Sequence, residues 1–308
     1  MSLIEQAAKR LEQLRQAGVE LPEDDVPVRI QEKNPVTPRR EARGIDTASP
    51  FSPPASPSVP AKRIDLDLDA IAASGLLVPQ GTNTQLASEY RVIKRPLIAN
   101  AMGRSAAPVA NGNLIMVTSS LPGEGKSFTA INLAMSIAME LDTTVMLVDA
   151  DVARPSILNM LGLPPAEGLL DVVQENSVDI SRVLLRTNIE KLSILPSGTK
   201  HPRATELLAS DAMIRLLEDM SRRYQDRIII FDSPPLLITT EARALATHMG
   251  QIVMVVQAGQ TTEAAVKEAV ATIDACPVKM TILNQARQST VEGYGYGYSL
   301  AYGYGHEK

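Results

Sequence analysis

A short glycine-rich run has the composition of a phosphate-binding loop. It reads Ser120-Leu-Pro-Gly-Glu-Gly-Lys-Ser127 and stands between an apolar run and a helical stretch. Its glycines let backbone N–H groups curl around phosphates, and the positive end of the following helix favours the same anion. In such loops the lysine reaches the β- and γ-phosphates and the final serine binds Mg²⁺, so the run predicts a site for ATP.

The loop is a variant, because the usual pattern has glycine where Ser120 stands. A strand–helix turn without any ligand is the alternative, and the segments on either side argue against it. The loop residues expected at the nucleotide are Ser120, Pro122, Gly123, Glu124, Gly125, Lys126, Ser127 and Phe128.

Three aspartates stand where apolar runs end. Val145-Met-Leu-Val-Asp149-Ala-Asp151 carries two of them, and Ile228-Ile-Ile-Phe-Asp232 carries the third. The carboxyl ends of parallel strands meet at one edge of a sheet, where ligands bind. Carboxylates there can hold Mg²⁺ or accept the proton of an attacking hydroxyl. Any one of them alone could simply cap a helix, whereas three at one phosphate loop favour chemistry.

The reaction partner is expected in the last fifteen residues, which hold five of the seven tyrosines with glycines between them. Such a run cannot build a core, because glycine maximises chain entropy. It can present several phenol hydroxyls on a flexible tether, and a low-complexity sticker without acceptor role is the alternative. The candidate acceptors are Tyr294, Tyr296, Tyr298, Tyr302 and Tyr304.

The elements that position these residues alternate between β and α type. Strand-like runs are expected at 114–119, 144–149, 192–196, 227–232, 251–256 and 279–283. Helical stretches are expected at 127–141, 211–224 and 262–275. The alternation predicts an α/β fold of the P-loop NTPase type, a mostly parallel sheet with helices on both faces.

The rest of the chain divides by composition. We expect an amphipathic helix at 1–18, a Pro-rich disordered linker at 19–63, a helical lead-in at 64–112, the P-loop core at 113–285 and a flexible Gly/Tyr-rich tail at 286–308. The first helix either packs on its own domain or docks on a partner or membrane surface. Residues 86–100 have a helical pattern up to Arg95-Pro96, where proline should break or kink the helix.

Composition excludes several classes of protein. A formal charge of -5 argues against a nucleic-acid binder, and the single cysteine, Cys276, excludes a disulfide framework. The histidines show no metal-ligand spacing. No apolar run approaches the roughly 20 residues of a membrane span, and the N-terminus lacks the layout of a signal peptide. A cytoplasmic protein is expected.

Together the motifs resemble those of the bacterial tyrosine kinases of exopolysaccharide and capsule synthesis. Ser120–Ser127 is similar to their Walker A loop, Asp149-Ala-Asp151 to Walker A′ and Ile228–Pro235 to Walker B, while the tail matches their tyrosine cluster. Partition-type ATPases share the fold but carry a lysine where this loop has Leu121. The run Ser88-Glu-Tyr-Arg-Val-Ile-Lys-Arg-Pro96 is similar to the exosortase-associated type.

Two departures concern an arginine and the subunit contact. The family continues Walker A′ as Asp-x-Asp-x-Arg, whereas here Ala153 stands at the last position and Arg154 follows. The ring-forming Glu-x-x-Arg-x-x-Arg helix of the family aligns as Ser88-x-x-Arg91-x-x-Lys94. Arg91 and Lys94 are therefore the oligomerisation candidates, with one charge partner lost.

The resemblance implies transfer of phosphate from ATP, with Mg²⁺, to tyrosine. Lys126 would stabilise the transferring group, Asp149 would serve as metal ligand or base, Asp151 would assist, and Asp232 and Ser127 would hold magnesium. Asn284 would contact adenine. Ten residues join Asn284 to Tyr294, a root-mean-square reach of roughly 17 Å and an extended limit of about 35 Å, which permits its own site or a neighbour's. Transfer to a neighbouring copy is expected, because in-line attack needs the phenol to point inward.

The family also implies partners: further copies of the chain in an oligomer, possibly a ring; a separate membrane-embedded activator or chain-length regulator that would hold the kinase at the inner membrane; and a phosphotyrosine phosphatase. Regulation of polysaccharide synthesis or export is the implied role. A partition- or septum-type ATPase switch of the same fold, without kinase activity, is the alternative.

Overall fold

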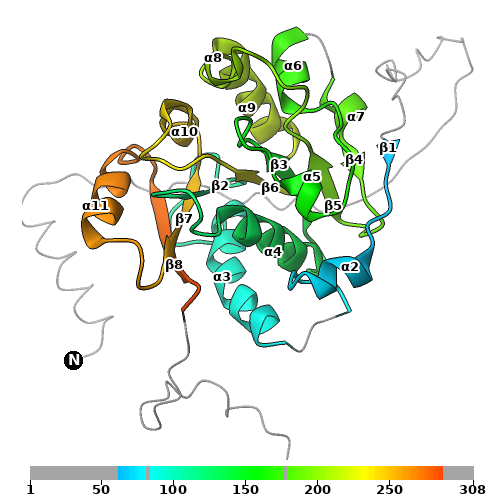
Figure 1. Cartoon of the computed structure of the whole chain (residues 1–308), viewed down its shortest axis with the longest axis horizontal. Coiled ribbons are helices and arrows are strands. Elements are labelled where there is room, and N and C mark those ends of the chain that lie inside the picture. Colours follow the sequence, from blue (N-terminus) through cyan, green and yellow to red (C-terminus); the bar gives the residue numbers. More distant parts are fainter. Residues whose placement is uncertain (1–61, 81–83, 176–178, 287–308) are drawn as a thin grey trace, which may run out of the picture. The chain divides into compact units, whose positions relative to one another are not determined.

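The structure is a computed structural model that describes residues 62–80, 84–175 and 179–286 (Figure 1). The predicted N-terminal helix, nearly all of the Pro-rich linker and the tail with its five tyrosines lie outside the described residues.

An eight-stranded sheet forms the centre of this part of the chain, in the order β1-β4-β5-β3-β6-β2-β7-β8. Every neighbouring pair is parallel except β4 with β5. The strands are β1 (Lys62–Arg63), β2 (Leu114–Ser119), β3 (Thr144–Asp149), β4 (Leu185–Arg186), β5 (Leu192–Leu195), β6 (Arg227–Asp232), β7 (Gln251–Gln257) and β8 (Val278–Asn284). The prediction of a mostly parallel sheet is confirmed.

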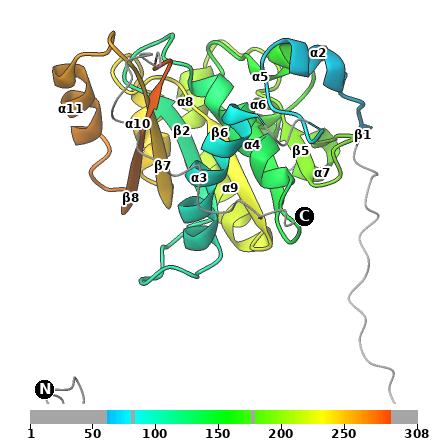
Figure 2. The same cartoon turned by 90° about the horizontal axis from the view of Figure 1, so that it is seen from below.

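Ten helices of the described residues cover the sheet. They are α2 (Leu68–Ala73), α3 (Gln85–Ala101), α4 (Lys126–Ala138), α5 (Ile157–Met160), α6 (Leu169–Glu175), α7 (Ile180–Val183), α8 (Ala204–Leu208), α9 (Asp211–Arg223), α10 (Thr240–Ala246) and α11 (Glu263–Ala271). Helices α6 to α11 pack on one face and α2 to α5 on the other. Figure 1 separates the two layers, and Figure 2 shows α2, α3 and α4 in front of the sheet.

The central strands are apolar on both faces because each face is covered. In β2, Leu114 and Met116 belong to the cluster under α6–α11, while Ile115 and Val117 belong to the cluster under α2–α5. Full burial on both sides explains why these strands are continuous apolar runs rather than alternating ones. It also holds their carboxyl ends firmly at one edge.

The lead-in packs against this core instead of standing apart from it. Strand β1 lies within the segment predicted as linker and pairs with β4. Helix α3 runs for 17 residues and includes Pro96, so the helix does not break at the proline, and the alternative of a kink stays a prediction. Pro96 has no N–H, so the helical hydrogen bond to the carbonyl of Val92 is missing. Val92 is 74% exposed, which places the freed carbonyl on the solvent side.

Lys94 lies inside the protein rather than on its surface. Its side chain is 3% exposed, its ammonium donates to the carbonyl of Ser136, and it lies 2.8 Å from the carboxylate of Glu140. A cation at the C-terminal end of α4 is favoured by the helix dipole. Lys94 therefore joins α3 to α4 within one chain, whereas Arg91 lies on the exposed side of α3; the role of both in self-assembly stays a prediction.

Candidate active site

The glycine-rich loop between β2 and α4 is shaped for an anion. Gly123 and Gly125 have φ angles of +88° and +94°, which only glycine adopts without strain. Gly125 begins α4 without any side-chain cap, so the first N–H groups of the helix remain available to a ligand. Ser120 is absent from the residues with positive φ, which explains why serine is tolerated at this variant position.

The buried side chain of Glu124 holds the phosphate loop in place through hydrogen bonds. Its side chain is 2% exposed, accepts from the N–H of Leu121 at 2.7 Å, and is hydrogen-bonded to the hydroxyl of Thr261 in the loop after β7. Only the backbone of Glu124 is left to face a phosphate. Thr261 is a functional residue that no sequence pattern indicated, because its partner lies 137 positions away.

The end of β8 also reaches the loop. The side-chain amide of Asn284 donates to the carbonyl of Glu124 at 2.9 Å, and a Cβ on Gly125 would meet that amide at 2.1 Å. Asn284, predicted to contact adenine, is thus placed at the nucleotide loop. Pro122 lies exposed in the loop, while Phe128 packs partly buried against the core under α2–α5.

The predicted catalytic side chains come together where β3 and β6 end. Asp149 and Asp232 are direct partners in the parallel register. The ammonium of Lys126 lies 2.6 Å from the carboxylate of Asp151 and 3.8 Å from that of Asp232. The hydroxyl of Ser127 accepts from Lys126 at 3.3 Å. All four residues predicted as catalytic therefore occupy one site with the serine of the loop.

Burial and neighbouring charges shift the pKa values of the ionisable side chains in this site. Burial, followed by the charge of Asp232, raises the pKa of Asp149 to about 7, against the N–H groups of Ile157 and Ser156 that donate to it. Burial also raises the pKa of Asp232 to about 6, although Lys126 opposes this shift. Burial disfavours the charged Lys126, yet Asp232 and Asp151 outweigh it and raise its pKa. The site therefore combines a protonated lysine with carboxylates that titrate near neutral pH.

The donor set fits Mg²⁺. Both carboxylate oxygens of Asp232 and one of Asp149 are buried without a hydrogen-bond partner among the described residues. Within that part of the chain no group of three or more His, Cys, Asp or Glu side chains could hold a metal alone. Mg²⁺ commonly takes one or two carboxylates and completes its shell with water and phosphate oxygens. Asp149, Asp232 and the hydroxyl of Ser127 match that requirement.

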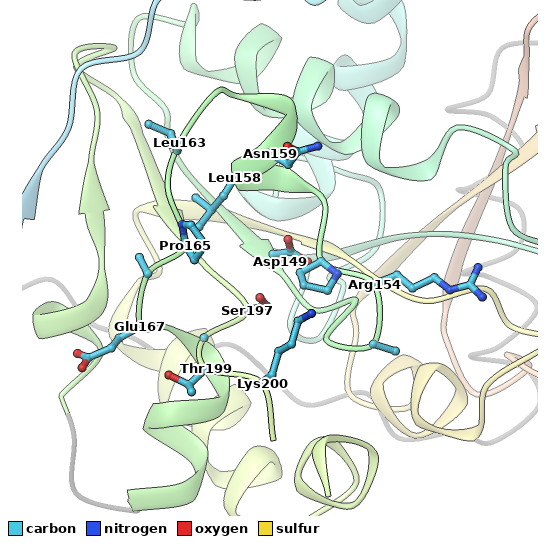
Figure 3. Close-up of a pocket in the computed structure, with 14 residues that line it drawn as sticks. Asp149, Arg154, Leu158, Asn159, Leu163, Pro165, Glu167, Ser197, Thr199 and Lys200 are labelled. Atoms are coloured by element: carbon cyan, nitrogen blue, oxygen red, sulfur yellow. The ribbon is translucent and has the colours of Figure 1, made fainter. Parts of the chain in front are cut away.

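A pocket of about 750 Å³ opens beside Asp149 (Figure 3). Its apolar wall includes Leu158 and Pro165, and Lys200 extends toward Asp149 from the other side. Arg154 also lines the pocket, but its side chain extends away from that apolar wall. An apolar wall that ends at a carboxylate is suited to an aromatic ring with a hydroxyl. The complete lining is Asp149, Ala153, Arg154, Pro155, Leu158, Asn159, Leu163, Pro165, Ala166, Glu167, Ser197, Gly198, Thr199 and Lys200.

Arg154 follows Ala153, which stands where the family has an arginine. Its backbone N–H donates to Asp151 at 3.2 Å, and its side chain is exposed.

No helix of the described residues is both long and apolar enough to cross a membrane.

Comparison with known proteins agrees with this site. The family described as the AAA domain matches residues 112–285. The chain is 32% identical over 222 residues to the tyrosine-protein kinase YwqD of Bacillus subtilis, which covers 70% of this chain and 87% of that protein. It is 30% identical over 190 residues to the tyrosine-protein kinase wzc of Salmonella typhimurium, covering 60% of this chain but only 26% of wzc.

Solved structures agree as well. The chimerical protein CapA2B2 is 26% identical with a TM-score of 0.55, over 70% of this chain and 97% of that one. The kinase domain of VpsO is 28% identical with a TM-score of 0.53, over 64% of this chain and the whole of that domain. The phosphate loop, the paired strand-end aspartates and these relatives lead to one conclusion: the chain belongs to the family of bacterial tyrosine-protein kinases.

Proposed function

We propose that this kinase transfers the γ-phosphoryl group of ATP to tyrosines of its own C-terminal tail, carried by another copy of the chain. One observation supports this most strongly. Asp149, a carboxylate with a pKa of about 7, stands between the phosphate loop and a pocket that can hold a phenol ring. A base with a pKa near the working pH is suited to proton transfer.

The chemistry follows from the positions of the side chains. The phenol oxygen attacks the γ-phosphorus, its proton passes to Asp149, and the bridging oxygen leaves with ADP. Lys126 carries a positive charge and stabilises the negative charge on the transferring group. In this structure its ammonium is held by Asp151 at 2.6 Å, so it exchanges this partner for phosphate when ATP binds. Mg²⁺ held by Asp232 and Ser127 would neutralise phosphate charge, while Asp149 acts as the base.

The acceptors and partners extend the proposal. The tail tyrosines, Tyr294 to Tyr304, are favoured because they follow β8, whose end contacts the phosphate loop through Asn284. A membrane-embedded activator, an opposing phosphatase, a place at the inner membrane and a role in polysaccharide export rest on the family resemblance. The exosortase-associated type stays a prediction. Self-assembly remains part of the proposal, with Arg91 and Lys94 as its predicted contact residues and the exposed Arg91 favoured.

Purified protein incubated with Mg-ATP tests the proposal, with modified residues mapped by mass spectrometry. Phosphate on Tyr294 to Tyr304, absent in Asp149→Asn, is the expected result. ADP release without phosphotyrosine would instead identify an ATPase switch. Phosphotyrosine that persists elsewhere after all five tail tyrosines are changed to phenylalanine would keep the kinase but refute the tail as acceptor.

A further inference from the structure

A second pocket lies at the opposite edge of the sheet from the nucleotide loop. It encloses about 640 Å³ where β3, β5 and β6 begin, and Arg63, Arg186 and Arg227 line it. Arg227 begins β6 and Asp232 ends it. Five steps along a strand separate the two edges by about 17 Å. The second pocket is therefore distinct from the phosphate loop and from the pocket beside Asp149.

Two of the arginines are exposed and stand side by side without an acidic partner in the part of the chain that the structure describes. Arg63 of β1 and Arg186 of β4 are direct partners in the parallel register, so two like charges stand side by side on one face of the sheet edge. Like charges directly opposite each other destabilise a strand pair. Across β4 the next partner is Ser193, a hydroxyl rather than a carboxylate. None of these three groups compensates the two charges.

Arg227 also lacks an acidic partner among the described residues. Its guanidinium lies 5.0 Å from the centre of the Tyr224 ring and 3.5 Å from the hydroxyl of Ser193, and its Nε is buried without a partner among the described residues. No carboxylate of the described residues forms an ion pair with Arg63, Arg186 or Arg227. The lining contains one acid, Glu190, while Lys191 is occupied by carbonyls at the end of α4.

These groups are the donors that a phosphate monoester requires. Guanidinium groups bind phosphate through two parallel N–H bonds, and the hydroxyl of Ser181 lines the same pocket, whereas those of Thr187 and Ser193 donate to backbone carbonyls. The ring of Tyr224 and the leucines of the lining offer contact to an aromatic ring. The pocket is local and concave, and the chain has a net charge of -5. It therefore differs from the extended basic stripe with which a nucleic-acid binder contacts its ligand.

We propose that this arginine pocket (Arg63, Arg186 and Arg227) binds a phosphotyrosine of the tail of a second copy of the chain. The proposal rests on the proposed function, which supplies the phosphotyrosine. Phosphorylation adds a charge of about -1.5 to -2 and three acceptor oxygens to each phenol. The binding would make the phosphorylation state of one copy a determinant of its contact with the next.

The reach of the tail favours a second copy over the same one. Strands β1 and β8 stand at opposite ends of the sheet (Figure 1). Seven strand spacings amount to roughly 34 Å, and the chain would also have to pass from one edge to the other. The eight steps along the chain from Ala286 to Tyr294 span at most about 28 Å. The chain at Tyr294 therefore falls short of Arg63 in its own copy, while Arg227 of β6 lies three strand spacings from β8, so the length limit applies to the β1 side of the pocket.

Binding of a synthetic peptide tests this without any kinase reaction. The peptide comprises residues 290–308 with phosphate on Tyr294, and fluorescence anisotropy follows its binding to the full-length protein, treated with phosphatase and kept free of ATP. We expect binding at least ~10-fold tighter than that of the unphosphorylated peptide, and a loss of ~10-fold or more in Arg186→Ala. Arg227→Lys, which keeps the charge but loses the planar fork, should weaken binding several-fold.

Arg104→Ala is the matched control, since Arg104 is exposed, lines neither pocket and removes the same charge; its affinity should stay within about 2-fold of the parent. Equal binding of both peptides would overturn the proposal. So would competition by inorganic phosphate at the concentration of the peptide, which would reveal a simple anion site. Unchanged affinity in both Arg186→Ala and Arg227→Lys would place the peptide in the pocket beside Asp149 instead. Because the phosphate is introduced chemically, these outcomes do not depend on whether the protein is a kinase.

Discussion

The two edges of the sheet carry opposite charges, and neither edge is neutralised by the residues that the structure describes. Where the strands end, Asp149, Asp151 and Asp232 gather around the ammonium of Lys126, and three carboxylate oxygens are left without hydrogen-bond partners among the described residues. Where they begin, arginines line a pocket without acidic ion-pair partners. Buried polar groups are normally satisfied, so the carboxylate oxygens and the buried Nε of Arg227 indicate what is missing, while the exposed Arg63 and Arg186 add positive charge. The first edge lacks a cation and the second lacks an anion.

The comparison also separates stability from function. Buried carboxylates with raised pKa values and adjacent like charges both reduce the stability of the folded chain. Such costs are expected at sites that bind ligands, because a ligand that binds only the folded state compensates them. Each of the following changes alters the charge at the nucleotide edge or the contacts that hold it in place.

The largest effect is expected for Lys126→Met, which removes the ammonium that pairs with Asp151 and Asp232. We expect phosphotyrosine formation to fall by about 100- to 1000-fold, because the charge of the transferring group loses its counter-charge. Quantitative mass spectrometry of the tail measures this. Lys267→Met on the exposed surface of α11 is the matched control and should keep near-parental activity; a similar loss in both variants would contradict the assigned role.

Asp232→Asn should lower activity by about 10- to 100-fold while it stabilises the protein without magnesium. Burial already disfavours the charged form of Asp232, so a neutral side chain of the same shape relieves the cost. Thermal unfolding at pH 8 with EDTA should therefore give a higher Tm than that of the parent. A lower Tm would show that attraction to Lys126 outweighs burial.

The pH dependence of stability should show the raised pKa of Asp149. The folded protein holds a proton on this group up to about pH 7, whereas the unfolded chain releases it near its ordinary value of 3.8. The contribution of Asp149 to the free energy of unfolding is therefore fully present below about pH 4 and is lost as pH rises toward 7.

Urea unfolding at pH 5 and pH 8 with EDTA measures the free energy of unfolding. The parent should lose about 1 to 3 kcal/mol more than Asp149→Asn over this interval. Parallel losses in the two proteins would show that Asp149 does not titrate in this range.

The smallest effect concerns Glu124→Gln, which weakens the internal brace of the phosphate loop. One carboxylate oxygen is replaced by an amide donor, so the charge-assisted bond from the hydroxyl of Thr261 is lost, and only a neutral bond in which that hydroxyl accepts can replace it. Loss of one such hydrogen bond predicts an increase of about 3- to 10-fold in KM for ATP with little change in kcat. Steady-state kinetics separates the two constants. Glu263→Gln, at an exposed position of α11, should leave both unchanged.

Much of the catalytic edge could be predicted from the sequence. Strands β2, β3 and β6 have the predicted limits, because each is an uninterrupted apolar run that must be buried on both faces. The aspartates at the ends of β3 and β6 follow from those limits. Once the strands are parallel, their carboxyl ends must meet.

The features that could not be predicted depend on contacts between distant residues. Strands β1 and β4 have two residues each, too few for a periodic pattern, and their pairing brings Arg63 beside Arg186. Lys94 matched a surface motif, but packing of α3 on α4 buries it. The partner of Glu124 is on another loop. None of these contacts leaves a local signal in the sequence.

The central claim is that the carboxylate edge transfers phosphate to the tail of another copy, and one mixing experiment tests it most directly. Lys126→Met protein with an intact tail is mixed with active protein whose five tail tyrosines are changed to phenylalanine, and Mg-ATP is added. We predict phosphate on Tyr294 to Tyr304 of the inactive partner, increasing with the concentration of the active one. Absence of phosphotyrosine on the inactive partner, while active protein with an intact tail becomes modified or only ADP is formed, would contradict the account.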